Sequence, residues 1–205
     1  GYSRRLRRPR FWYLNPFESR SSQNVIYKGN PGLTPTFTNS FDLGYLQKIG
    51  KLTLNSSIYF QHSINSILRV SRDEIRLLDG VNQVITIREP INLASEDRFG
   101  FELTANYNPS KKVRLSGSFN VFQQESKGLY AYNKFIIDEV TGAISSTPET
   151  QDLGNTNNSW FTRFNATFSL PWKIQMQNRL SYRGPRNTAQ SDSEGIFSAN
   201  IALSK

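Results

Sequence analysis

The sequence has no cysteine, one methionine (Met176) and one histidine (His62). Without cysteine, neither a disulfide framework nor a thiolate metal site can form within this chain. No segment approaches the ~18 consecutive apolar residues that a membrane-spanning helix needs. A lone histidine without neighbouring paired carboxylates also provides neither a metal site nor a catalytic triad. We therefore expect no enzyme activity and no catalytic, cofactor-binding or metal-binding residue.

Two features of an intact N-terminus are missing as well. The opening segment GYSRRLRRPRFWYL has no initiator methionine. It also has no apolar core of about 7–15 residues, which a signal peptide requires. We interpret the chain as an internal piece of a longer protein, so the missing signal peptide says nothing about export.

The composition combines low hydrophobicity with many aromatic residues. Hydrophobic residues make up 37% of the 205 residues, aromatic residues 13%, and the formal net charge is +9. Disordered chains are poor in aromatic residues, whereas a sheet with one apolar and one polar face has this composition. The positive charge is compatible with anionic lipid headgroups, an acidic ligand or nucleic acid.

Apolar and polar residues alternate through most of the chain. In KLTLNSSIYFQHS, the side chains of Leu52, Leu54 and Ile58 share one face, and mostly polar residues share the other. This period of two indicates β-strands. Similar alternation covers residues 37–45, 99–107, 113–121, 164–172, 172–182 and 197–203. No segment indicates a convincing helix, and residues 75–78 are the nearest candidate.

The connections between these strands alternate between tight and long. Tight turns are predicted at 48–51, 108–111 and 170–172, and long polar stretches at about 8–36, 63–95, 124–156 and 184–194. Transmembrane β-barrels combine short periplasmic turns with long extracellular loops in this way. The pattern favours such a barrel over a soluble β-sandwich, whose strands usually have only about 5–6 residues.

The distribution of side chains along the predicted strands agrees with this interpretation. Tyr45, Tyr107, Trp160, Trp172 and Tyr182 lie near strand ends, as the aromatic girdles of a barrel require. In the segment 37–45 we expect one set of side chains to face lipid and the other to face a wet interior. The lipid-facing set is Phe37, Phe41, Leu43 and Tyr45, and the interior set is Thr38, Ser40 and Asp42.

Several motifs carry a resemblance to a known family. GNPGLTP followed by FTNSFDLGY resembles the GNPDLKPE…SFELGY signature of TonB-dependent outer-membrane receptors, most closely those of an outer-membrane β-barrel family. RRLRRPRFWYLNPF, LNSSIYFQHSINSILR, FGFELTANYNPSKKVRLSGSFNVF and NRLSYRGPRNTAQ occur in that family's order, so the resemblance covers about residues 4–205. Gly32, Thr34 and Thr36 depart from it, standing where the family usually has Asp, Lys and Glu.

The resemblance implies an all-β fold, an antiparallel transmembrane β-barrel segment with about eight of roughly 22 strands. Residues 1–205 would be part of a single TonB-dependent receptor β-barrel domain, whose plug domain and remaining strands are not in this chain. The implied function is TonB-dependent transport of a scarce ligand, such as an iron chelate, vitamin, peptide or glycan, across the outer membrane of a Gram-negative bacterium. The alternatives are an outer-membrane scaffold or assembly component without transport activity, and a soluble basic β-domain that binds polyanions.

Candidate ligand contacts come from two basic segments. They are Arg4, Arg5, Arg8, Trp12, Tyr13, Arg183 and Arg186. The arginines near the N-terminus could form an electropositive patch at the mouth or lumen of the barrel, or a solvated face balanced by acidic residues elsewhere. Expected partners are outer-membrane lipid and lipopolysaccharide, the protein's own plug domain and TonB, and a surface lipoprotein or larger outer-membrane complex. We expect no nucleic-acid partner.

Overall fold

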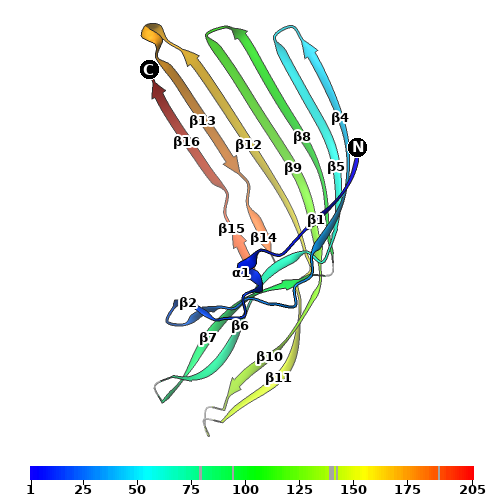
Figure 1. Ribbon diagram of the computed structural model, residues 1–205, viewed down its shortest axis with the longest axis vertical. Helices are drawn as coiled ribbons and strands as arrows, with labels where there is room; N and C mark the ends of the chain where they lie inside the picture. The colour runs from blue at the N-terminus through cyan, green and yellow to red at the C-terminus, as the bar shows by residue number, and fades with distance from the viewer. Residues whose placement is uncertain (79, 94, 139–140, 142, 189) are drawn as a thin grey trace.

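Eight strands of the computed structural model form one antiparallel sheet, in the order β1-β4-β5-β8-β9-β12-β13-β16 (Figure 1). The structure describes residues 1–205 except 79, 94, 139–140, 142 and 189. The strands are β1 (Tyr2–Arg7), β4 (Thr36–Ile49), β5 (Leu52–Ile64), β8 (Ser95–Ser110), β9 (Val113–Lys127), β12 (Asn155–Ser169), β13 (Gln175–Arg183) and β16 (Ile196–Ser204). This confirms the predicted all-β meander of about eight strands. The sheet is open, because β1 and β16 each pair on one side only among the described residues.

Three tight connections lie at one end of the sheet, which we call the turn end (Figure 1). They join β4 to β5 at Gly50, β8 to β9, and β12 to β13 through the 3-10 helix η1 (Pro171–Lys173). The turn predicted at 108–111 lies slightly later, because β8 continues to Ser110. The register shifts between Tyr107 and Ser110, and this irregularity accommodates Pro109, which has no N–H for a regular ladder.

The long connections at the opposite end are folded, although their polar sequences predict loops. They contain β2 (Ser19–Ser22), β3 (Val25–Tyr27), β6 (Ile67–Leu78), β7 (Val81–Asn92), β10 (Leu129–Ile137), β11 (Ile144–Asp152), β14 (Arg186–Thr188) and β15 (Ser191–Ser193). Residues 75–78 therefore belong to a strand. The helix that the sequence did not predict is α1 (Phe11–Leu14), which is too short to produce a helical period. We call α1 and these hairpins the hairpin assembly.

The hairpin assembly has its own apolar core. Strand β3 pairs in parallel with β7, and Ile26, Ile85 and Ile87 are buried between them and their neighbours. A second cluster joins β6 to the β10–β11 hairpin through Val70, which is 0% exposed, and Tyr130. These contacts connect segments that are far apart in the sequence, so the long connections form one packed unit.

Hydrogen bonds and ion pairs also join the hairpins. Arg76 donates to both carboxylate oxygens of Glu18, each at 2.7 Å, and to Glu74 at 2.9 Å. The bond from Arg76 lowers the pKa of Glu18 below its usual value. The Tyr130 hydroxyl donates to Glu89 at 2.6 Å, and burial together with this bond raises the pKa of Tyr130. The carboxylates of Glu18, Glu74 and Glu89 therefore all have partners within the assembly.

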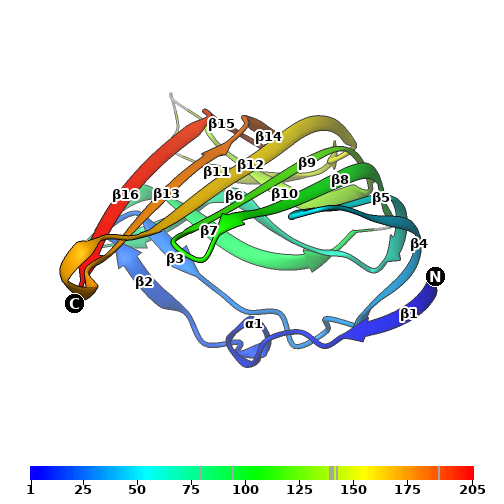
Figure 2. The ribbon, with the colours of Figure 1, turned by 90° about the horizontal axis from the view of Figure 1, so that it is seen from above.

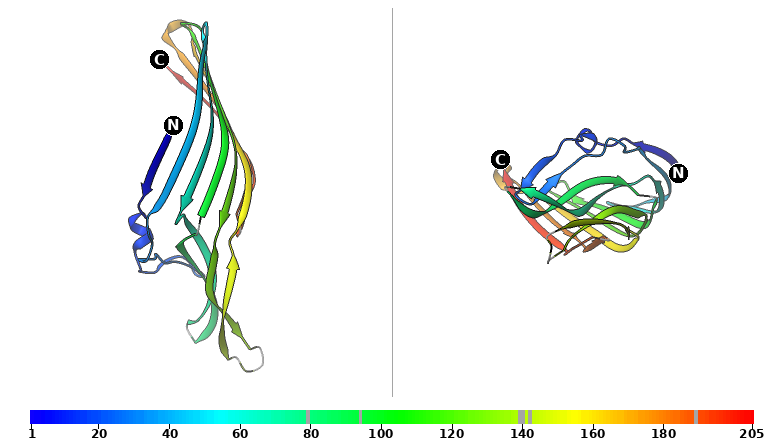
Figure 3. Two further views of the ribbon diagram at one scale, coloured as in Figure 1. Left: turned by 90° about the vertical axis from the view of Figure 1, so that its right-hand side faces the viewer. Right: turned by 90° about the horizontal axis from the view of Figure 1, so that it is seen from below.

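The eight-stranded sheet is curved, and its two faces differ in polarity. Figure 2 shows the strands as an arch with α1 and β2 on its open side, and Figure 3 shows the same curvature from the side and from below. Cross-strand pairing aligns Leu43, Ile58, Phe101, Val121 and Trp160 on the convex face. Leu43 is 70% exposed, so this apolar face is bare.

The concave face carries the polar partners. The side chains of Thr38 and Ser63 form a hydrogen bond of 2.8 Å there, and Asp42 lines a cavity on the same face. The predicted division of the segment 37–45 into an apolar and a polar face is thus confirmed. No helix in the described part of the chain is long and apolar enough to cross a membrane.

Candidate functional site

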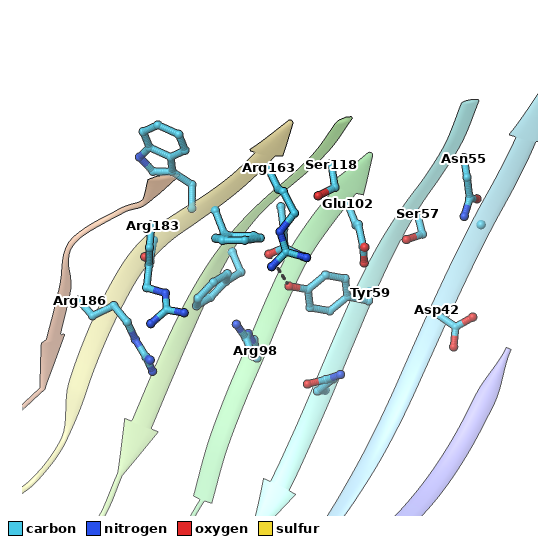
Figure 4. A pocket seen from close by; sticks show the side chains of 17 residues that line it. Asp42, Asn55, Ser57, Tyr59, Arg98, Glu102, Ser118, Arg163, Arg183 and Arg186 are labelled. Atoms are coloured by element: carbon cyan, nitrogen blue, oxygen red, sulfur yellow. Dashed lines mark hydrogen bonds between the residues drawn. The ribbon is translucent and has the colours of Figure 1, made fainter. Parts of the chain in front are cut away.

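A cavity of about 1030 Å³ lies on the concave face (Figure 4). Its lining comes from the central strands of the sheet, with one residue from β14, and consists mostly of polar and charged side chains. The charged residues are Asp42, Arg98, Glu102, Arg163, Arg183 and Arg186. Figure 4 shows the four arginines projecting toward the same space, from β8, β12, β13 and β14.

Two of these arginines lie over aromatic rings on the same face. The guanidinium carbon of Arg98 is 3.7 Å from the centre of the Phe122 ring, and that of Arg163 is 5.1 Å from the centre of Phe161. Such contacts are attractive because the ring face is electron-rich. The Nε atom of Arg98 is buried and has no hydrogen-bond partner among the described residues.

Close packing beside the arginines involves Gly100. A Cβ atom at this position would lie 2.5 Å from atoms of the Tyr59 ring and 2.8 Å from the carbonyl oxygen of Val121. The Tyr59 hydroxyl donates to Oδ1 of Asn120 at 3.2 Å, the bond drawn as a dashed line in Figure 4. Glycine within a strand often marks such a close approach, and here it lets the tyrosine ring lie flat against the lumen wall.

A bend after β13 places the two predicted candidates at this cavity. The N–H of Gly184 donates to the carbonyl of Trp160 at 2.7 Å, and a Cβ at Gly184 would lie 3.1 Å from that carbonyl oxygen. The chain therefore stays close to β12 while it turns into β14. Arg183 and Arg186, on either side of the bend, both line the cavity.

Arg98 and Arg163 were missed as candidates, although the sequence contains a signal for both. Arg163 directly precedes the predicted strand 164–172 and lies on the same face as its polar residues. Arg98 directly precedes the predicted strand 99–107 and likewise shares the face of its polar residues. Arg98 and Arg163 come close to Arg183 and Arg186 only because of the order of the strands in the sheet. Alternation within a single strand does not reveal that order.

Trp12 and Tyr13 lie in a different cavity, of about 440 Å³, within the hairpin assembly. The Arg69 guanidinium carbon is 5.1 Å from the centre of the Tyr13 ring. The motif beginning at Gly29 holds this segment, because the Gly29 N–H donates to the Asn15 carbonyl at 2.9 Å and the Asn30 N–H to the Tyr13 carbonyl at 2.6 Å. The motif is thus a backbone clasp around the end of α1.

The arginines near the N-terminus do not form one patch. Arg4 pairs with Asn39 on the convex face, where its guanidinium carbon is 5.5 Å from the centre of the Phe37 ring. Arg5 pairs with Thr38 and faces the concave side. Arg8 is exposed between β1 and α1. Alternation along β1 therefore separates side chains that the sequence analysis grouped together.

His62 lies near the end of β5 that adjoins the hairpin assembly, and it has a structural contact. Its Nδ1 atom is 2.6 Å from Oδ1 of Asp97 across the β5–β8 pair. Within the described residues, no three histidine, aspartate or glutamate side chains are grouped as metal ligands. The histidine and its carboxylate join two neighbouring strands.

Comparison with protein-family models identifies the family of this chain. A model of the outer membrane protein beta-barrel family matches residues 1–205, and a search of curated proteins found no match. Barrels of the outer membrane have an apolar outer band, a polar interior, short periplasmic turns and longer extracellular loops. The convex face, the concave face, the turn end and the hairpin assembly correspond to these four features. The chain belongs to the outer membrane protein β-barrel family and is located in the outer membrane of a Gram-negative bacterium.

Proposed function

We propose that this chain is the wall and extracellular part of a TonB-dependent transporter for a scarce ligand. The observation that carries the proposal is the charged cavity on the concave face, next to a folded assembly of long hairpins. A polar lumen beneath structured surface loops is what the passage of a solute requires. The GNPGLTP and FTNSFDLGY motifs add the resemblance to TonB-dependent receptors.

Each part of the chain has a role in this mechanism. The apolar convex face holds the wall in the bilayer, and the hairpin assembly meets the ligand first. The concave face contacts the ligand and a plug domain, which TonB rearranges at the expense of the proton-motive force. The plug and the other strands of a barrel of roughly 22 strands would come from sequence outside this chain. Lipopolysaccharide and a surface lipoprotein are further proposed partners.

The test is the TonB dependence of uptake by cells that carry the full-length gene. Depletion of small molecules from the growth medium is compared by mass spectrometry between cells with the gene, cells without it, and cells with the gene but without TonB. We expect at least one compound to be depleted only when both the gene and TonB are present. Equal depletion in all three strains, with the protein folded in the outer membrane, contradicts transport and favours a scaffold role.

A further inference from the structure

We infer that the ligand of this lumen site is anionic, and that Arg98, Arg163, Arg183 and Arg186 bind its carboxylate, sulfate or phosphate oxygens. As a statement about a transported ligand, the inference rests on the proposed function. As a statement about a binding site, it rests on charge, hydrogen bonding and geometry at the concave face.

The first argument is the charge at the cavity. Four arginines line it, but only two carboxylates do, Asp42 and Glu102. None of the four arginines forms an ion pair with a described residue. Glu96 is near enough to Arg98 and Arg186 to interact electrostatically, yet it pairs with neither. The cavity therefore has an excess of positive charge facing a space large enough for a small molecule.

The hairpin assembly provides an internal comparison. Arg72 and Arg76 each bind two glutamate carboxylates there, at distances of 2.7 to 3.4 Å. Arg72 and Arg76, which join hairpins, are thus neutralised by carboxylates. The lumen arginines differ from them in having no such partner in the part of the chain that the structure describes.

The second argument is the unpaired donor of Arg98. Its Nε atom is buried without an acceptor among the described residues. Buried donors nearly always have a partner in folded proteins, because leaving one unsatisfied is costly. An acceptor for this Nε atom can come from water, from a bound molecule or from another part of the protein, and an anionic oxygen is the strongest of these acceptors for a guanidinium.

The third argument is the orientation of the guanidinium groups. Stacking on Phe122 limits the rotation of Arg98, and Phe161 does the same for Arg163. A guanidinium held by one face presents its N–H groups in its own plane, which suits paired bonds to carboxylate, sulfate or phosphate. The adjacent ring faces also allow contact with a flat apolar part of the ligand.

Binding of the fluorescent trianion pyranine (8-hydroxypyrene-1,3,6-trisulfonate) to the purified full-length protein tests this inference. Fluorescence anisotropy gives the Kd of the wild type and of two double variants, Arg98→Gln with Arg163→Gln and Arg183→Gln with Arg186→Gln. We expect each pair to weaken binding at least ~10-fold, because two charge-assisted contacts are lost. Heat-modifiable migration in gels verifies that each variant is folded. The pair Arg183→Gln with Arg186→Gln lies at a strand end, where substitutions disturb the barrel wall less.

The matched control is Arg179→Gln. Arg179 lies on the concave face of β13, outside the cavity, and its Nε atom already donates to Asn165 at 3.1 Å. The same change in charge there is expected to alter the Kd less than ~2-fold, because Arg179 does not line the cavity and a charge without direct contact to the ligand is partly screened in salt. An equal loss in the control, or no pyranine binding by the wild type, overturns the inference.

Two further outcomes separate the site from its alternatives. Unchanged pyranine binding together with faster hydrogen exchange in the plug of the variants would assign the arginines to plug carboxylates and overturn the inference. Normal binding without TonB-dependent uptake would instead refute only the proposed function. Lost pyranine binding with unchanged TonB-dependent uptake would leave the anion-binding site standing but overturn its assignment to the transported ligand.

Discussion

Replacing Leu103 by arginine is expected to lower the free energy of unfolding of the full-length barrel by about 2–4 kcal/mol. Leu103 lies midway along β8 on the convex face and pairs with Ser56 and Phe119. A lipid-facing charge near the bilayer midplane loses its hydration without gaining a partner, which is the reason for the large cost. Equilibrium urea unfolding of the protein in lipid vesicles measures the change.

The neighbouring substitution Thr104→Arg is its control. Thr104 pairs with Asn55 and Ser118, which line the concave cavity. The new side chain would lie in a wet lumen, and we expect a loss below ~1 kcal/mol, as for ordinary exposed positions. If the two variants lose similar stability, or Thr104→Arg loses more, then the assignment of the faces is contradicted.

Replacing Gly29 by alanine is expected to release α1 from the hairpin assembly. A Cβ at this position would lie 2.3 Å from the carbonyl oxygen of Asn15 and 2.7 Å from that of Tyr13. Both contacts are with backbone, so the two segments have to separate, and the hydrogen bonds of Gly29 and Asn30 are lost. Two such bonds correspond to about 1–3 kcal/mol of local stability. Hydrogen exchange of residues 11–30 in the full-length protein measures it.

The same motif contains the control, Gly32→Ala. A Cβ there would meet only the side-chain oxygen of Asn30, at 3.2 Å, and Gly32 has an ordinary backbone conformation. We expect hydrogen exchange close to that of the wild type. Increased exchange in both variants would mean that the loop tolerates no added side chain at either glycine. Exchange as slow as in the wild type in both variants would contradict the role of Gly29 in holding α1.

The faces of the sheet were predictable because they depend on local alternation alone. In β8, Phe99, Phe101 and Leu103 have a period of two that requires no knowledge of neighbouring strands. The hairpin assembly was not predicted as such. The segment from Val84 to Ile87 alternates less clearly than β8, and its burial depends on parallel pairing with β3, about 60 residues earlier. Local patterns contain no information about such a distant partner.

Part of the lining of the concave cavity was also predictable from local sequence patterns. Arg183 and Arg186, which line the cavity, were predicted as ligand contacts from a basic, turn-rich segment, and the alternation of β8 could have added Arg98. The stacking of Arg98 on Phe122 depends on the register between β8 and β9. That register includes the irregularity near Pro109, which the alternation does not predict. Strand order and register thus decide which polar residues of the lumen face form a site.

The accessibility of spin labels along β8 tests directly which face of the sheet contacts lipid and which contacts water. This chain has no native cysteine. Once any cysteine in the rest of the full-length protein has been replaced, single cysteines can carry the label at Phe101, Leu103 and Ala105 and at Glu102 and Thr104. We expect labels at the odd positions to collide preferentially with oxygen dissolved in lipid, and labels at the even positions with a water-soluble nickel chelate. Accessibility without a period of two, or with the opposite phase, would contradict this assignment of the two faces.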